Sequence, residues 1–198
     1  MRREAQLIDH GLYLGPFQAS LNQQKMRDLG VTHILCIRDR KEASLIYPRF
    51  PESFRYMTLD ISDNADQNII TIFPRCKEFI HHAISNGGTV LAHCNGGIAL
   101  APAIVVGYLM WNYGWSFDTT LSYVQSRRYC VSPMSFQIQL KEYEPIVIAQ
   151  KMMEAQGYMG VPSGKKREGI EIDDDDDDDY KRKPPARPNY ALPMKMDL

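Results

Sequence analysis

The chain has 198 residues, 44% of them hydrophobic, and its 23 basic and 24 acidic residues give a net charge of −1. This length predicts one domain of about 150 residues followed by a tail. This net charge conceals a strong local imbalance near the C-terminus, and we expect protein partners and no nucleic acid.

The N-terminus lacks the apolar core of a signal peptide, and the longest apolar run, residues 100–111, is too short to span a bilayer. The cysteines show neither a CxxC pair nor metal-ligand spacing: Cys36, Cys76, Cys94 and Cys130. We therefore expect a soluble intracellular protein without membrane contact, disulfides, bound metal or cofactor.

Strands and helices are predicted to alternate in the first half. Apolar runs bounded by turn residues predict strands at 11–15, 31–37 and 54–59. The Ser-x-x-Gln pattern at Ser20 predicts a capping box that opens a helix, and Gly30 closes that helix. The polar segment 38–51 is expected to be irregular.

The second half is predicted to be mainly helical. Apolar residues recur every three or four positions over about 69–86, and Pro74 moves the expected start towards Ile72. A strand follows into His93, and then helices to about 113, from Ser116, and over about 135–156. This order predicts an α/β sandwich with a mixed central sheet flanked by helices, in a domain spanning 6–155.

The segment 89–110 carries the main functional pattern. A β-like run ends at His93-Cys94, a glycine-bearing loop follows, and then an apolar helical segment begins. Such a junction forms a nest of backbone N–H groups at a helix N-terminus, which suits an anion or a cysteine thiolate. The candidate phosphate-loop residues are His93, Asn95, Gly96, Gly97, Ile98, Ala99 and Leu100.

This junction resembles that of the cysteine-dependent protein phosphatases, whose pattern is His-Cys-x-x-Gly-x-x-Arg-Ser/Thr. His93, Cys94 and Gly97 match it, but Leu100 replaces the arginine and Ala101 the hydroxyl residue. The arginine would bind two phosphate oxygens and stabilise the transition state, and losing one such donor typically costs about 10²–10³ in rate. The resemblance therefore implies a cysteine-phosphatase-like fold that has lost catalysis.

Within that class, segments over 6–149 resemble the dual-specificity phosphatases, and 59–64 and 123–133 look most like the serine/threonine/tyrosine-interacting (STYX) pseudophosphatases. Members of that group typically lose the cysteine and keep the arginine, whereas this chain does the reverse. Met134 also replaces an asparagine that commonly braces the loop. The resemblance implies phosphoprotein signalling partners, such as MAP kinases or ubiquitin-ligase substrate receptors.

The remaining catalytic positions are vestigial candidates. Cys94 stands at the nucleophile position, where a small buried residue is the alternative. Asp63 matches the general acid, with Asp60 and Asp66 as rivals; Asp66 also suits a helix cap. His93 is expected to orient the loop.

Residues 157–198 form a different region. Seven aspartates, 173–179, lie between basic clusters at 165–167 and 181–183, and apolar residues are sparse, so we expect disorder. The basic clusters resemble a nuclear-import signal, which predicts a cytoplasmic protein with a nuclear pool as the alternative to a solubilising tail. The segment 181–194 fits both an SH3-domain ligand and a MAP kinase docking peptide.

Three functional hypotheses follow. The first is an inactive phosphatase-like protein that acts as a protein-binding module. The second is a weak cysteine-dependent phosphatase in which Arg127 or Arg128 replaces the missing cation, although a solvated helix end is the plainer interpretation of that pair. The third is a hub of linear motifs in the tail.

Overall fold

The computed structural model describes residues 3–62, 64 and 66–156. Five strands form one mixed sheet: β1 (Gln6–Asp9), β2 (Leu12–Pro16), β3 (Val31–Arg38), β4 (Arg55–Asp60) and β5 (Thr89–Cys94). Their order is β1-β2-β5-β3-β4, with β1 antiparallel to β2 and the other pairs parallel. The central strand, β5, is therefore the one that ends at Cys94.

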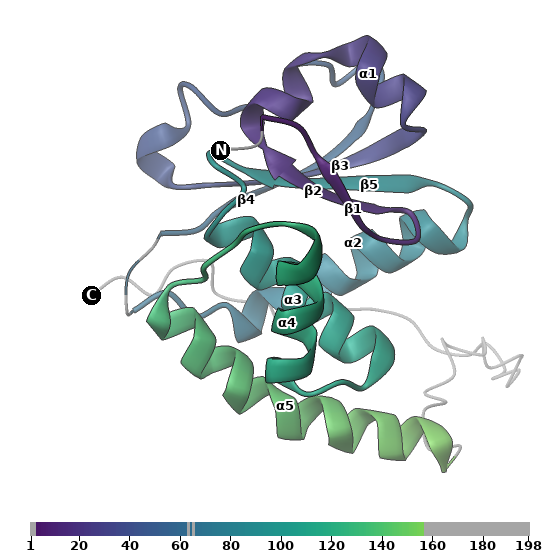
Figure 1. Cartoon of the computed structure of the whole chain (residues 1–198), viewed down its shortest axis with the longest axis vertical. Helices are drawn as coiled ribbons and strands as arrows, with labels where there is room; N and C mark the ends of the chain where they lie inside the picture. The colour runs from purple at the N-terminus through teal and green to yellow at the C-terminus, as the bar shows by residue number, and fades with distance from the viewer. Residues whose placement is uncertain (1–2, 63, 65, 157–198) are drawn as a thin grey trace, which may run out of the picture.

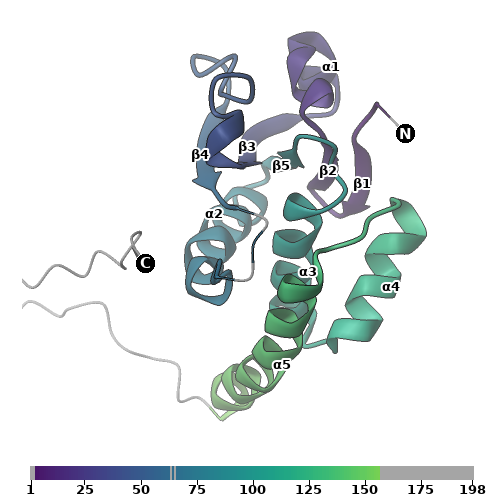
Figure 2. The ribbon, with the colours of Figure 1, turned by 90° about the vertical axis from the view of Figure 1, so that its left-hand side faces the viewer.

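Helices cover both faces of the sheet (Figure 1). The helix α1 (Gln23–Asp28) lies on one face, and the other four lie on the opposite face: α2 (Phe73–Ser85), α3 (Leu100–Tyr113), α4 (Phe117–Arg127) and α5 (Met134–Ala155). Short 3-10 helices occur at Phe17–Leu21, Arg40–Glu42 and Ile70–Ile72. Figure 2 shows α3 between the sheet and α5. The predicted α/β sandwich with a mixed sheet is confirmed.

The core divides into two parts because both faces of the sheet are covered. The larger part joins the sheet to α2–α5, and α3 is its centre, with 11 of its residues buried. Gly107 allows this packing, since a Cβ there would lie 2.4 Å from the ring of Phe73. The smaller part lies under α1 and includes Met26, Ile34 and Leu91. No helix in the described ranges is long and apolar enough to cross a bilayer.

Several local predictions need correction. The Ser20 capping box is wrong: Ser20 is buried in a 3-10 helix, and Asn22 caps α1 by accepting from the Lys25 N–H at 2.9 Å. The strand β1 was not predicted. The helix start near Ile72 is confirmed, because α2 begins at Phe73 with Pro74 in its first turn, and Ser116 caps α4 as expected.

Candidate phosphate-loop site

The strand β5 brings the two residues that define the site to one edge of the sheet. In the register of the sheet, Cys94 lies opposite Pro16 on β2, and His93 lies opposite Cys36 on β3. Both side chains are buried, with exposed fractions of 1% for His93 and 4% for Cys94. Cys94 thus lies at the carboxyl end of a central parallel strand, where α/β folds bind ligands.

The loop after Cys94 is fixed through four successive carbonyl groups. The backbone N–H of Phe17 donates to Asn95 O at 3.0 Å, and that of Val131 donates to Ile98 O at 2.9 Å. The guanidinium of Arg128 donates to Gly96 O at 3.0 Å and to Gly97 O at 2.8 Å. A trans peptide unit points its N–H opposite to its carbonyl, so each of the four N–H groups that follow points away from the partner of the preceding carbonyl. These N–H groups are the candidates for the predicted nest, which stays a prediction.

Arg128 is a structural part of this loop. It is 5% exposed, and it also donates to Glu4 O at 3.1 Å and to the side chain of Gln6. The interpretation of this arginine as a solvated helix end is wrong. Because its guanidinium binds the carbonyl side of the loop, it does not take the place of the missing arginine on the amide side.

Gly97 shows how closely the loop fits its surroundings. Its φ of +64° is in the left-handed region, which favours glycine. A Cβ at this position would lie 2.4 Å from the carbonyl carbon and oxygen of Gly15, and 2.7 Å from Nη2 of Arg128. The glycine shared with the phosphatase pattern is therefore required by backbone packing, independently of any ligand.

Leu100 is the first residue of α3 and packs into the main core with an exposed fraction of 8%. Ala101 beside it is fully buried. Neither side chain offers a hydrogen-bond donor or a charge to the loop. Arg127, the other candidate cation, stacks 3.6 Å from the ring centroid of Tyr123 and donates to the Tyr123 carbonyl at 3.2 Å. Backbone amides and the helix dipole remain as the means of attracting an anion.

His93 does not add a positive charge at neutral pH. Burial lowers its pKa to about 4, against a smaller opposing effect of a hydrogen bond with the Cys94 backbone. The ring lies 5.7 Å from that of Phe17, in the segment that anchors Asn95. His93 is thus a neutral packing residue behind the loop.

A carboxylate beside the loop was not predicted. Glu42 accepts from the Asn95 side chain at 2.6 Å and from the Asp39 N–H at 3.3 Å. The capping box Asp39-x-x-Glu42 fixes the position of Glu42, and that sequence pattern was a signal available in advance. A negative charge here opposes the binding of a phosphate dianion.

The candidate general acid, Asp63, lies outside the described residues. Its rival Asp60 pairs with Arg38 at 2.8 Å. Asp66 is exposed and does not cap the next helix, since Asn68 accepts from the Thr71 N–H instead. The side chain of Gln139 on α5 holds the backbone of residues 67–69 in place: it accepts from the Ile69 N–H at 2.8 Å and donates to Gln67 O at 2.7 Å.

All four cysteines are free and buried. Within residues 3–62, 64 and 66–156, no group of three His, Cys, Asp or Glu side chains could hold a metal ion. The acidic run and the proposed docking segment 181–194 lie outside the described residues.

Residues 12–146 match the model of the dual specificity phosphatase catalytic domain. The chain belongs to the dual-specificity phosphatase family. This confirms the resemblance drawn from the segment around His93 and Cys94; the matched range includes Leu100, whose place at the family's arginine position stays a prediction.

Relatives refine the comparison. The serine/threonine/tyrosine-interacting protein of Mus musculus is 41% identical over 187 residues, which cover 88% of this chain and 84% of the relative. Dual specificity protein phosphatase 1 of Arabidopsis thaliana is 37% identical over 70% of this chain and 68% of the relative. The crystal structure of human serine/threonine/tyrosine-interacting protein matches at 46% identity with a TM-score of 0.69, over 73% of this chain and 98% of that one. The predicted resemblance to this group is confirmed.

Proposed function

We propose that this member of the family is a catalytically inactive, phosphatase-like protein that acts as a protein-binding module or scaffold in phosphoprotein signalling. The observation that carries the proposal is Leu100, buried at the arginine position while Arg127 and Arg128 are engaged elsewhere. Without a bidentate cation, the loop lacks a donor that would bind two phosphate oxygens and stabilise the transition state.

An exposed apolar segment beside the loop supports a binding role. It comprises Tyr129, Val131, Met134 and Ile138, whose exposed fractions are 74%, 49%, 70% and 52%. The Val131 N–H bond to Ile98 O fixes this segment directly against the loop. Clustered exposed apolar side chains are typical of protein-interaction surfaces, and aromatic residues and Met are enriched there.

The partners that we propose are phosphoproteins or kinases such as MAP kinases, and subunits of ubiquitin ligases. The relatives' printed name, serine/threonine/tyrosine-interacting protein, fits such a role. The tail segment 181–194 would provide a second contact, to an SH3 domain or a MAP kinase. The basic clusters at 165–167 and 181–183 suit a protein shared between cytoplasm and nucleus.

The experiment measures binding of a purified, phosphorylated MAP kinase to the full chain. We expect Cys94→Ser to leave the affinity unchanged, because binding does not use the thiolate. Combined Tyr129→Asp and Met134→Asp should weaken it at least tenfold, about 1.4 kcal/mol. The matched control is Leu45→Asp, since Leu45 is 68% exposed but lies outside the segment.

Two results would contradict the proposal. Loss of binding in Cys94→Ser would show that the Cys94 side chain takes part in the interface. Equal binding by the double variant and the control would remove the apolar segment from the interface.

A further inference from the structure

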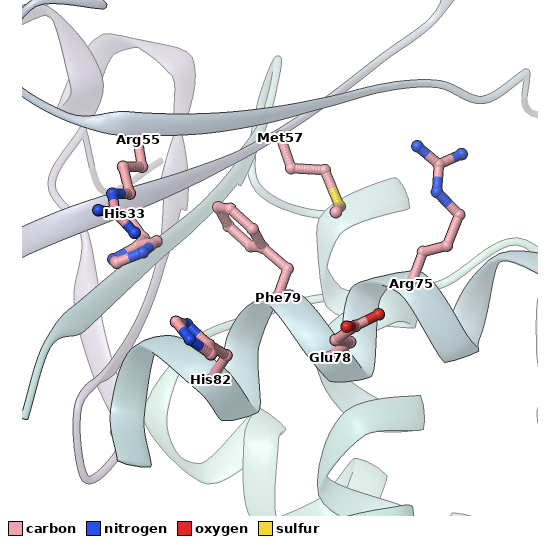
Figure 3. Close-up of a pocket in the computed structure, with 7 residues that line it drawn as sticks. All are labelled: His33, Arg55, Met57, Arg75, Glu78, Phe79 and His82. Atoms are coloured by element: carbon pink, nitrogen blue, oxygen red, sulfur yellow. The ribbon is translucent and has the colours of Figure 1, made fainter. Parts of the chain in front are cut away.

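A cleft of about 300 Å³ is lined by α2, by the edge strand β4 and by β3, the strand next to it. Its lining residues are His33, Arg55, Met57, Arg75, Glu78, Phe79 and His82 (Figure 3). His33 pairs in register with Arg55 and with Val90, four residues before Cys94, so the cleft lies towards the opposite end of the strands from the phosphate loop.

The residues that line the cleft recur at the spacings of a helix and of a strand. Four lining residues come from α2 at spacings of three and four, which places them on one helix face. Two come from alternate positions of β4 and share one face of the sheet. The strand β4 is at the edge of the sheet, so the cleft opens at the side of the molecule.

The cleft is positively charged. Its lining residues include two arginines, Arg55 and Arg75, and one carboxylate, that of Glu78, and two histidines add charge when protonated. The pKa of His33 is lowered by burial first and then by the charges of Arg55 and His82. These neighbours repel a proton on His33, and a bound anion would relieve that repulsion.

The floor of the cleft is apolar. Met57 and Phe79 lie between the charged groups, and the ring of His33 meets that of Phe79 edge-on at 5.3 Å. A matching ligand therefore carries several negative charges next to apolar side chains. Within this chain, the run 173–179 has seven aspartates, flanked by Ile172 and Tyr180.

The connection is long enough. Residues 157–172 separate the described domain from the aspartates, and they can extend to roughly 55 Å. A domain of this size has a radius of gyration of about 15 Å, so every face is within reach. A short tether of this kind gives an effective concentration in the millimolar range, which makes even weak docking significant.

We propose that the acidic run 173–179 docks into the cleft formed by His33, Arg55, Arg75 and His82. Docking holds the neighbouring segment 181–194 against the domain. Acidic partners that enter the cleft would release this segment.

The test measures histidine pKa values by NMR in the full chain at low salt. The variant replaces all seven aspartates of 173–179 by asparagine. Because a nearby anion stabilises the imidazolium, we expect the pKa values of His33 and His82 to be about 0.5 higher in wild type than in the variant. The difference should shrink in 0.5 M NaCl. His10 and His81, which do not line the cleft, are internal controls.

A second arm uses charge reversal. Arg55→Glu with Arg75→Glu should abolish the His82 difference between aspartate and asparagine tails, whereas Arg27→Glu on α1 should preserve it. A synthetic peptide of residues 169–183, added to the asparagine variant, should raise the His33 and His82 pKa values again.

Equal histidine pKa values with either tail would overturn the proposal, and would be the result if the aspartates pair with the tail's own basic clusters. Equal pKa changes at His10 and His81 would overturn it too, because they would show only a long-range electrostatic effect of the tail on the whole domain.

Discussion

The side chain of Leu100 removes both a bidentate donor and a fixed positive charge from the loop. The backbone of the loop is held by carbonyl contacts to Phe17, Arg128 and Val131, so we expect its shape not to depend on a bound anion. The backbone shape of the loop is therefore independent of the side chains that would bind phosphate, and substitutions at positions 100 and 101 test this independence directly.

We expect vanadate to leave the melting temperature of wild type unchanged. Leu100→Arg with Ala101→Ser should restore vanadate-dependent stabilisation of several degrees, since it returns the fork and the hydroxyl to an intact nest. Leu100→Arg alone should lower the melting temperature without ligand, because an unpaired charge enters a site that is 8% exposed. A double variant that folds but is not stabilised by vanadate would show that the N–H groups of the loop do not have the geometry that binds an oxyanion.

His93 makes stability depend on pH. Its folded-state pKa of about 4 lies below the ordinary value of 6.5, so between these values the unfolded chain binds the proton more tightly. The contribution of buried, neutral His93 to the free energy of unfolding is complete above pH 6.5. It falls as the pH decreases, by about 2 kcal/mol between pH 7 and pH 5. Urea unfolding at both pH values measures it. His93→Asn should lose this component and the exposed control His10→Asn should keep it; identical pH dependence in both variants would refute the assignment.

At the scale of elements, the loop is held by chain segments far apart in sequence: the β1 region, the start of the first 3-10 helix, and the segment after α4. Arg128, in the segment after α4, connects the loop to the β1 region, because it binds Gly96 and Gly97 as well as Glu4 and Gln6. Loss of this side chain leaves buried carbonyl groups unsatisfied.

Arg128→Ala should therefore reduce the free energy of unfolding by about 3 kcal/mol or more. The neighbouring Arg127→Ala is the matched control and should cost less than about 1 kcal/mol, since it loses stacking on Tyr123 and two hydrogen bonds at the surface, to Tyr123 O and to the Ser126 hydroxyl. Chemical denaturation of both variants makes the comparison. Equal losses would show that Arg128 does not anchor the loop.

Local patterns predicted most elements but failed where tertiary contacts decide. The apolar spacing over α2 and the Ser116 cap were sufficient, because each is stabilised within its own segment. Ser20 matched a capping pattern, yet it is buried and donates to Phe17 O at 2.7 Å, so Asn22 caps the helix instead. The strand β1 has four residues and depends on pairing with β2, which no local pattern reveals.

The same distinction applies to the site. The motif predicted the place of His93, Cys94 and the glycines on a strand–loop–helix junction. The contributions of Arg128 and Glu42 come from contacts across 31 and 53 positions of the chain, so they require the fold. Asp63 lies outside the described residues, and its role stays a prediction.

At the scale of the molecule, a phosphatase fold keeps its central sheet, its loop and its cysteine, and we propose that the side chains around the loop do not support phosphoryl transfer. Leu100 is apolar, His93 is neutral at pH 7, and Glu42 places a negative charge beside Asn95. All three act in the same direction, against binding a phosphate dianion. The central claim is therefore that Cys94 is not a working nucleophile.

Turnover of an aryl phosphate by wild type and by Cys94→Ser tests this claim most directly. Both proteins are folded full chains, assayed at equal concentration across pH 5–8, with the Leu100→Arg and Ala101→Ser double variant alongside. We expect wild type and Cys94→Ser to hydrolyse the substrate at the same background rate. A wild-type rate well above that of Cys94→Ser, saturable in substrate and blocked by vanadate, would contradict the account and identify the chain as an active phosphatase.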